Sequence, residues 1–384
     1  MAVRIAFQVF PVVAWCVCMA AFVLPLRLGR LHTLVAGLAF AAAFAKFAVF
    51  ALAGGDGFNP ELPQGVIWLC GWAYATAVLV TGLSVAAWVV RLPLRLLLRR
   101  PAGLRATRIL AVASLALAAS TSLWGMYEGV AVPAVREKTV FFSNLPQEFD
   151  GFRILHLSDL HCSAAARRGR FEAIVSAANA SSPDLVAITG DFVDGLVADR
   201  LDDLAPLAGL RAPCGVFGCS GNHEAYWDWP GWSAALKGMG IVFPEDDGAV
   251  AIRRGNAALA VGAIPDVAVR PLPADAAAGI ERCFAGTPRG AFRILLFHRP
   301  WTAATGAELP EAGVSLQLSG HTHGGAMPGL ASIVARFNEG RVKGLYTLAG
   351  GAAVHVSPGT GQWAGFPLRL FNPSEATLLV LRRQ

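Results

Sequence analysis

Two histidines separated by one threonine lie in the segment SGHTHGG at residues 319–325, directly after the apolar run 314–318. In an extended segment, side chains two positions apart point the same way, so His321 and His323 are expected to face one point. The two glycines that follow would let the backbone turn closely around that point. The pattern is typical of a metal site or a catalytic cluster, although a polar strand end with a tight turn would give the same letters.

Further groups that suit hard or borderline metal ions follow other apolar runs. Asp159 and His161 are a second pair two positions apart, and Asp191 follows Gly190, where backbones can crowd together. The candidate ligands are Asp159, His161, Asp191, Asn222, His298, His321 and His323. This set exceeds the needs of one tetrahedral ion and indicates two ions that share a bridging carboxylate. Oxygen and nitrogen ligands without thiolate favour Mn, Fe, Zn or Mg.

The segments that precede these groups must position them. Five apolar runs that end in polar residues are predicted to be strands: 152–158, 184–189, 215–220, 292–297 and 314–319. Stretches around 168–180 and 199–209 are compatible with helices between them. Alternating strands and helices predict an α/β domain, and ligands in such domains collect outside the carboxyl ends of the strands.

Five blocks of this part resemble a known family. DLH, GDFVD, GNHE, FHRP and GHTH are similar, in order, to the signature blocks of the calcineurin-like metallophosphoesterases, in their membrane-anchored bacterial branch. The resemblance covers roughly residues 150–382. It implies a two-sheet β-sandwich flanked by helices, and a hydrolase that cleaves phosphate esters, diesters or pyrophosphates by attack of a hydroxide held between two divalent metal ions.

The resemblance also implies a role for each block. The implied ligands are Asp159, His161, Asp191 and His323 for one ion, and Asp191, Asn222, His298 and His321 for the other. His223 would contact the phosphate and protonate the leaving oxygen, a task for a side chain that titrates near neutrality. Asp194 could support the metal site or cap a turn. Glu224 and Ala326 stand where the family often has Asp and Gln, which affects substrate detail rather than the ligand set.

The first 128 residues differ in composition from the rest. They hold ten basic and three acidic residues, a charge of +7, and the total of +6 leaves −1 for the remainder. Because the basic surplus belongs to this apolar part, no nucleic-acid partner is expected. Four apolar runs each approach the ~20 residues that cross a bilayer: 5–26, 33–53, 66–90 and 109–127. The predicted organisation is four transmembrane helices (1–128), a connector with strand character (129–150) and the phosphoesterase domain (151–384).

The loops between these runs predict an orientation. The loop 91–108 carries six arginines, and the loop 54–64 carries none. The positive-inside rule therefore places the arginine loop in the cytoplasm and the phosphoesterase domain outside it. Arg4 argues in the opposite direction. We expect a multi-pass protein of the cell (inner) membrane with an extracytoplasmic catalytic domain.

Several residues have no assigned role in this scheme. Lys46 falls inside the second apolar run, where a charge marks a functional site unless it snorkels to the headgroups or faces the bundle. The stretch AYWDWPGW at 225–232 is expected to pack as an insertion, or to form an amphipathic lip that meets lipid. His156 is expected to be buried and hydrogen-bonded, and His355 to pack in a strand or contact the substrate.

Two classes of function remain. The first is a membrane-tethered binuclear phosphoesterase whose substrate is a phosphoester, with a lipid-linked ester at the bilayer surface as a candidate. The second is a sensor or transport-associated membrane protein that binds metal and phosphate without turnover, although the full ligand set argues against it. A serine hydrolase lacks support, since no GxSxG segment is present.

Overall fold

The chain divides into two compact units. The computed structural model describes residues 2–53, 57–98, 103–271, 276–301, 309 and 312–384. The helical unit comprises residues 1–127 together with 364–368. The α/β unit comprises residues 128–363 together with 369–384. Residues 364–368, near the C-terminus, thus belong to the same compact unit as the N-terminal helices.

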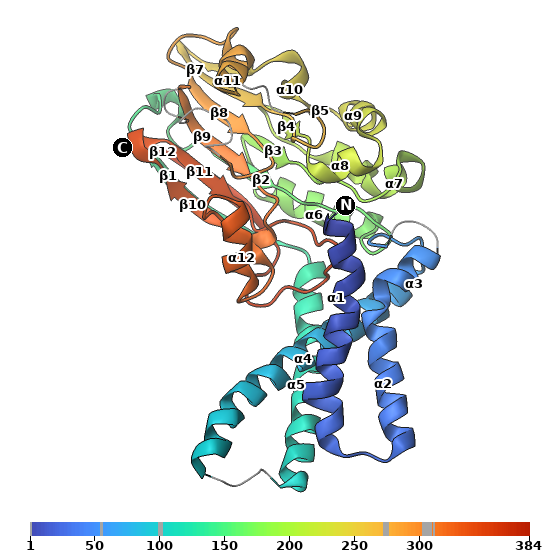
Figure 1. Ribbon diagram of the computed structural model, residues 1–384. Helices are drawn as coiled ribbons and strands as arrows, with labels where there is room; N and C mark the ends of the chain where they lie inside the picture. The colour runs from blue at the N-terminus through green and yellow to red at the C-terminus, as the bar shows by residue number, and fades with distance from the viewer. Residues whose placement is uncertain (1, 54–56, 99–102, 272–275, 302–308, 310–311) are drawn as a thin grey trace. The chain divides into compact units, whose positions relative to one another are not determined.

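The helical unit covers the four predicted apolar runs (Figure 1). Its helices are α1 (Ala2–Cys18), which continues through two irregular turns to Leu26, α2 (Arg30–Phe44), α3 (Lys46–Leu52), α4 (Gln64–Leu98) and α5 (Leu104–Val130). Two helices, α4 and α5, are long and apolar enough to cross a membrane. The pair α2 and α3 is bent by 61° and would make a third span if the two act as one. Four spans therefore stay a prediction, and residues 54–56 and 99–102 of the predicted loops lie outside the described residues.

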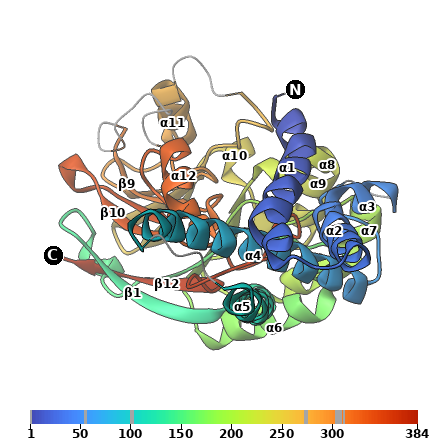
Figure 2. The same ribbon diagram turned by 60° about the horizontal axis from the view of Figure 1, so that its bottom comes forward.

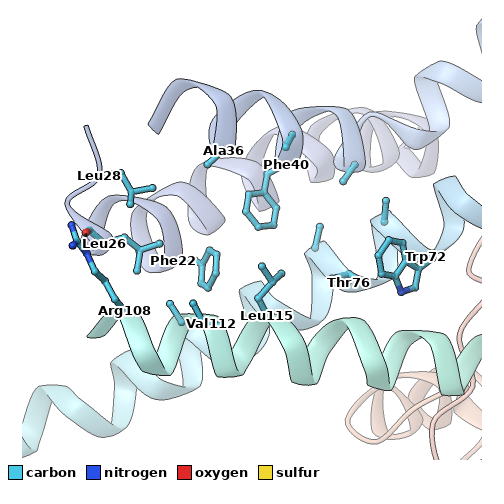
Figure 3. Close-up of a pocket in the computed structure, with 15 residues that line it drawn as sticks. Phe22, Leu26, Leu28, Ala36, Phe40, Trp72, Thr76, Arg108, Val112 and Leu115 are labelled. Carbon is cyan, nitrogen blue, oxygen red and sulfur yellow. Dashed lines mark hydrogen bonds between the residues drawn. The ribbon is translucent and has the colours of Figure 1, made fainter. Parts of the chain in front are cut away.

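An apolar cavity of about 590 Å³ lies between these helices (Figure 3). Phe22 and Phe40 line its middle, and Arg108 lies at one end. The Arg108 guanidinium donates hydrogen bonds to the carbonyl oxygens of Leu26 and Arg27, each at 3.1 Å. The arginine thereby satisfies backbone acceptors at the turn between α1 and α2.

Two six-stranded sheets form the α/β unit. The first has the order β1-β12-β2-β3-β4-β5, and the second has the order β10-β11-β9-β8-β7-β6. Neighbours from β2 to β5 are parallel, as are β7, β8, β9 and β11. The strands are β1 (Ala134–Phe142), β2 (Arg153–Leu157), β3 (Leu185–Thr189), β4 (Val216–Cys219), β5 (Ile241–Val242), β6 (Val250–Arg254), β7 (Ala257–Ala263), β8 (Phe292–Leu296), β9 (Val314–Ser319), β10 (Gly344–Thr347), β11 (Ala353–Val356) and β12 (Glu375–Arg383). All five predicted strands are confirmed.

Apolar side chains arrange the unit in layers. The facing sides of the two sheets share one buried core, to which Ile154 and Ile294 belong. Helices on the outer face of each sheet bury further apolar clusters. These helices are α6 (Arg168–Ala180), α7 (Val197–Leu204) and α9 (Trp229–Gly238) over the first sheet, and α11 (Ala276–Phe284) over the second. The predicted two-sheet sandwich flanked by helices is confirmed.

The segment after α5 belongs to the first sheet. Only residues 131–133 separate the end of α5 from the start of β1. Strand β1 then pairs in parallel with β12, from Ala134 opposite Glu375 to Phe142 opposite Arg383, and the two run side by side (Figure 2). Residues 134–142 of the predicted connector 129–150 therefore form a strand of the first sheet.

Candidate metal centre

Loops after five parallel strands bring the predicted ligands together. Strands β2, β3 and β4 of the first sheet and β8 and β9 of the second end at these loops. The ligand candidates lie within five residues of a strand end: Asp159 and His161 after β2, Asp191 after β3, Asn222 after β4, His298 after β8, and His321 and His323 after β9. The five candidates that follow β2, β3, β4 and β8 are buried. His321 and His323, which follow β9, are partly buried. The topology thus gathers the seven candidate ligands at the carboxyl ends of these strands.

The ligand atoms form two adjacent groups. In each group the offered atoms lie within 4.8 Å of one another: Asp159, His161 and His323, and Asp191, His298 and His321. Oδ2 of Asp191 lies 3.1 Å from Nε2 of His298 and 3.8 Å from Nε2 of His161. One carboxylate therefore faces both groups, as a bridge between two ions would.

Hydrogen bonds outside the two groups orient the histidine rings. Nδ1 of His161 lies 3.0 Å from Oδ2 of Asp194, and Nδ1 of His298 lies 2.7 Å from the carbonyl oxygen of Thr189. Because these oxygens accept, each Nδ1 donates, and the ring is held with Nε2 turned toward its group. Metal-binding histidines usually have this outer support from a carboxylate or a carbonyl.

The cluster contains one buried polar atom without a partner among the described residues, and two pairs of histidine nitrogens that face each other. Oδ1 of Asn222 is buried and accepts no hydrogen bond from any group that the structure describes. Nε2 of His161 lies 3.0 Å from Nε2 of His323, and Nε2 of His298 lies 3.2 Å from Nδ1 of His321. A buried carbonyl oxygen without a donor is costly, and a cation would satisfy both it and the facing nitrogens. The donors therefore fit a pair of divalent metal ions.

Left-handed backbone, rather than extended strand, aims the ligands. Strand β9 ends at Ser319, and His321 and His323 have positive φ angles of 70° and 47°. The two histidines consequently join different groups, and the expectation that they face one point is wrong. Asp159, His161 and Asp191 also have positive φ, at 53°, 47° and 52°. Each such residue costs about 1–3 kcal/mol of backbone strain, which typically clusters at functional sites.

Two glycines permit the close approach of these loops. A Cβ on Gly221 would lie 2.2 Å from Oδ1 of Asp191. A Cβ on Gly320 would lie 1.8 Å from Oγ of Ser158 and 2.4 Å from Oδ2 of Asp159. Any larger residue would push a candidate ligand out of place, which explains the glycine that opens the GNHE and GHTH blocks.

His223 lies beside the two groups at the start of α8 (Asn222–Trp227). Its Nδ1 is bonded to a carboxylate oxygen of Asp194, its Nε2 lies 3.9 Å from Oδ2 of Asp191, and its side chain is 14% exposed. His223 and Asp194 also form a close group with His161. Burial lowers the pKa of His223, but the carboxylates of Asp191 and Asp194 outweigh it and raise that pKa to about 10. The surroundings therefore favour the protonated ring.

Glu224 supports the loops from below. Its buried carboxylate accepts hydrogen bonds from the backbone N–H groups of Gly221, Asp191 and Val193, at 2.8, 3.1 and 3.2 Å. Burial, and then the neighbouring Asp191 carboxylate, raise the pKa of Glu224 to about 8. Glu224 thus joins the loops after β3 and β4.

Sequence reasoning missed two arginines at the border of the cluster. Nη1 of Arg299 lies 3.4 Å from Nε2 of His321, while its Nε donates to Asp266 at 2.8 Å. Nη2 of Arg369 lies 3.2 Å from Nδ1 of His323. The place of Arg299 in the FHRP segment could have revealed it, whereas Arg369 lies 46 residues beyond His323 and has no local signal. Their charges favour an anionic ligand.

Comparison with known proteins agrees with this geometry. Residues 152–325 match the family model of the calcineurin-like phosphoesterases. This chain contains a calcineurin-like metallophosphoesterase domain. All five blocks that suggested the family lie within the matched residues.

Named relatives extend the match beyond this domain model. The "transmembrane protein with metallophosphoesterase domain" of Danio rerio is 32% identical over 276 residues, which are 71% of this chain and 62% of that protein. An uncharacterized metallophosphoesterase of Helicobacter pylori (strain J99) is 30% identical over 261 residues, which are 67% of this chain and 66% of that protein. The match thus spans less than two thirds of each relative. A solved dimetal phosphatase from Danio rerio aligns with 55% of this chain and 88% of its own at 14% identity, with a TM-score of 0.35.

Two tryptophans of the aromatic stretch 225–232 pack against the core of the phosphoesterase domain. Trp232 is fully buried and donates from Nε1 to the carbonyl oxygen of Gly195 at 2.9 Å. Trp229 packs against the same core, so the packing expectation is confirmed and a lipid-facing lip is wrong for these two residues. Tyr226 differs, since it is 64% exposed and its ring lies 5.3 Å from that of His223.

Two further histidines lie buried in the phosphoesterase domain. Nε2 of His156 lies 2.8 Å from Oγ1 of Thr189, and its Nδ1 lies 2.9 Å from Nδ1 of His355. His156 is therefore buried and hydrogen-bonded as predicted. His355 is also fully buried in β11, which agrees with strand packing rather than a substrate contact.

Proposed function

We propose that the chain is a membrane-tethered phosphoesterase that works with two divalent metal ions. The observation that carries the proposal is the Asp191 carboxylate, which lies within 3.8 Å of a histidine nitrogen from each ligand group. The unpartnered Oδ1 of Asn222 supports it. The proposed ligands are Asp159, His161, Asp191 and His323 for one ion, and Asp191, Asn222, His298 and His321 for the other.

The residues of the chain divide the chemistry between them. Ions of Mn, Fe, Zn or Mg at this centre would lower the pKa of water and offset the negative charge of phosphoryl oxygens. Arg299, held by Asp266, brings a guanidinium to the edge of the centre and is the candidate to bind a phosphoryl oxygen. His223, oriented by Asp194, donates its Nε2 proton to the leaving oxygen as the phosphorus–oxygen bond breaks.

Exposed apolar side chains near the centre favour a lipid-linked ester as the substrate. Tyr226 touches the proposed proton donor and is 64% exposed. Helix α12 (Leu330–Phe337) follows the GHTHGG loop and exposes Ile333 and Phe337, at 53% and 73%. Phe371 is 73% exposed beside the residue that bonds the His323 carbonyl. In a chain with helices of membrane length, this pattern suits a phosphate held at the bilayer surface.

Turnover by the full-length protein in detergent tests the catalytic claim. A p-nitrophenyl phosphodiester should be hydrolysed with Mn²⁺, and Asp191→Asn should abolish this turnover. His223→Ala should lower kcat by about 10²–10⁴-fold for an alkyl ester, and far less for the p-nitrophenyl ester, whose leaving group needs no proton. Binding of inorganic phosphate without turnover of any ester would instead support a sensor.

Paired substrates test the lipid claim. Ile333→Ser and Phe337→Ser should impair hydrolysis of a phospholipid in mixed micelles and leave a short soluble diester almost unaffected. An equal loss on both substrates would contradict a lipid-facing role for these side chains.

We also propose that four spans anchor the domain outside the cytoplasm of the cell. The six arginines of residues 91–108 support this orientation. A C-terminal alkaline phosphatase fusion should be active and a fluorescent-protein fusion dark, and the reverse pair of results would overturn the orientation.

A further inference from the structure

A buried lysine lies within the helical unit. Lys46 begins α3, where the chain bends by 61° after α2, and it is 1% exposed. Its ammonium lies 4.9, 5.1 and 5.3 Å from the ring centroids of Phe47, Phe50 and Tyr74. Among the described residues no carboxylate forms an ion pair with it. Lys46 therefore faces the interior of the unit and does not snorkel outward.

The hydrogen-bond partners of Lys46 come from a distant segment. Its Nζ donates to the carbonyl oxygens of Ala364 and Gly365, at 2.9 and 3.0 Å. These residues begin the strap, which we define as residues 364–368, the late segment that is counted with the helical unit. The strap also places Phe366 edge-on to Tyr74. A buried ammonium needs such acceptors, and backbone carbonyls of the strap supply them.

The strap is continuous at both ends with residues of the phosphoesterase domain that touch its metal centre. Trp363 precedes it, and the Trp363 ring lies 5.9 Å from the ring of His223. Arg369 follows it and lies 3.2 Å from Nδ1 of His323. Arg369 is held independently, because its guanidinium also donates to the carbonyl oxygens of Pro358 and Gly361, each at 2.7 Å. Before Trp363, Gln362 accepts from Nε of Arg369 at 2.7 Å. After Trp363, the next side chain that holds the strap is Lys46, through the carbonyl oxygen of Ala364.

We propose that Lys46 is a positioning residue, which holds the strap so that Trp363 stays packed against His223. The activity part of this inference rests on the proposed function. The ammonium fixes the carbonyls of the two residues that directly follow Trp363, so losing it frees that end of the strap and leaves the Arg369 end in place. A residue inside the predicted membrane part thereby supports the proposed proton donor.

Hydrogen–deuterium exchange of the full-length protein in detergent tests the anchoring claim without any substrate. Lys46→Met removes the charge and the three donors while keeping an unbranched chain. Peptides that cover 364–366 should exchange at least several-fold faster, and those that cover 369–372 should not change. Val80→Ala, a cavity variant at a buried position of α4, is the control for general loosening of the bundle. Equal exchange of the strap in both variants would overturn the proposal.

Kinetics test the positioning role. Lys46→Met and Trp363→Leu should each lower kcat several-fold with little change in KM, and the double variant should be no worse than the single ones. Phe366→Ala loosens the strap while keeping Lys46, and should reproduce the loss if Lys46→Met fails to fold. Additive losses, or an unchanged kcat in both strap variants, would reject the role. Absence of turnover in the wild type would reject the proposed function, while the exchange result would still decide the anchoring.

Discussion

The backbone N–H of His321 donates to both carboxylate oxygens of Asp159, at 3.1 and 3.2 Å, across 162 residues of sequence. Asp159 follows β2 of the first sheet, and His321 follows β9 of the second. The contact therefore ties the two sheets together at the metal centre. A ligand carboxylate that accepts backbone donors is fixed in orientation before any ion binds, and such preorganisation of a site is what precise metal geometry requires.

Asp194→Asn should weaken the centre although Asp194 is outside the two ligand groups. The carboxylate accepts from Nδ1 of His161 and of His223, and an amide cannot serve both rings as an acceptor in the same way. We expect metal affinity or kcat/KM to fall by about 10–100-fold, measured by metal titration and by turnover. Asp228→Asn, at the exposed cap of α9, is the matched control and should leave both quantities unchanged.

Gly221→Ala should displace the proposed bridging ligand. The added methyl would lie 2.2 Å from Oδ1 of Asp191, so the loop after β3 or the one after β4 must shift. The variant should bind fewer than two ions per chain by elemental analysis and lose nearly all turnover. Gly238→Ala, where a Cβ meets nothing within 4 Å, should keep two ions and full activity. Full occupancy in Gly221→Ala would contradict the assignment of Asp191.

Glu224→Gln should destabilise the phosphoesterase domain. The carboxylate accepts three backbone N–H groups, and a glutamine turns donors toward some of them. Leaving a buried donor unsatisfied costs about 1–3 kcal/mol, which should appear as a lower midpoint of thermal unfolding. Glu172→Gln, whose exposed carboxylate pairs with Arg168 on α6, should change the midpoint very little.

Removal of metal should lower both activity and stability. Cations that bind only the folded chain add stability by mass action, so a chelator should reduce the unfolding midpoint. Two equivalents of Mn²⁺ per chain should restore turnover, and Asp191→Asn should show a smaller chelator effect than the wild type. Restoration that saturates at one equivalent would contradict a paired centre.

Residue order and apolar patterning predict most of this domain. The apolar runs locate all five strands, and Asp159, Asn222 and His298 each lie in a loop after a strand, as the rule that ligands gather at carboxyl strand ends predicts. The directions of side chains in the loops are not encoded in this way. His321 and His323 have left-handed backbone, which hydrophobic alternation does not reveal, so the two histidines serve different groups.

Contacts between residues far apart in the chain are a second feature that the sequence does not reveal. The acceptors of Lys46 lie 318 and 319 residues away, and nothing near Ala364 or Gly365 marks them as ligands of an ammonium. Trp232 shows a related difficulty, because the sequence of the aromatic stretch 225–232 does not reveal which of its rings is buried. The sequence shows that these side chains are present, but their direction and burial depend on how the folded chain packs.

The junction between α5 and β1 is short. Three residues lie between Val130 and Ala134, and this stretch can span roughly 14 Å when fully extended. With α5 embedded in a bilayer, this short connection would tether the first sheet to the membrane. If α5 lies in a bilayer, β1 must begin within this distance of the helix end, so the domain could not diffuse away from the leaflet that holds the helix.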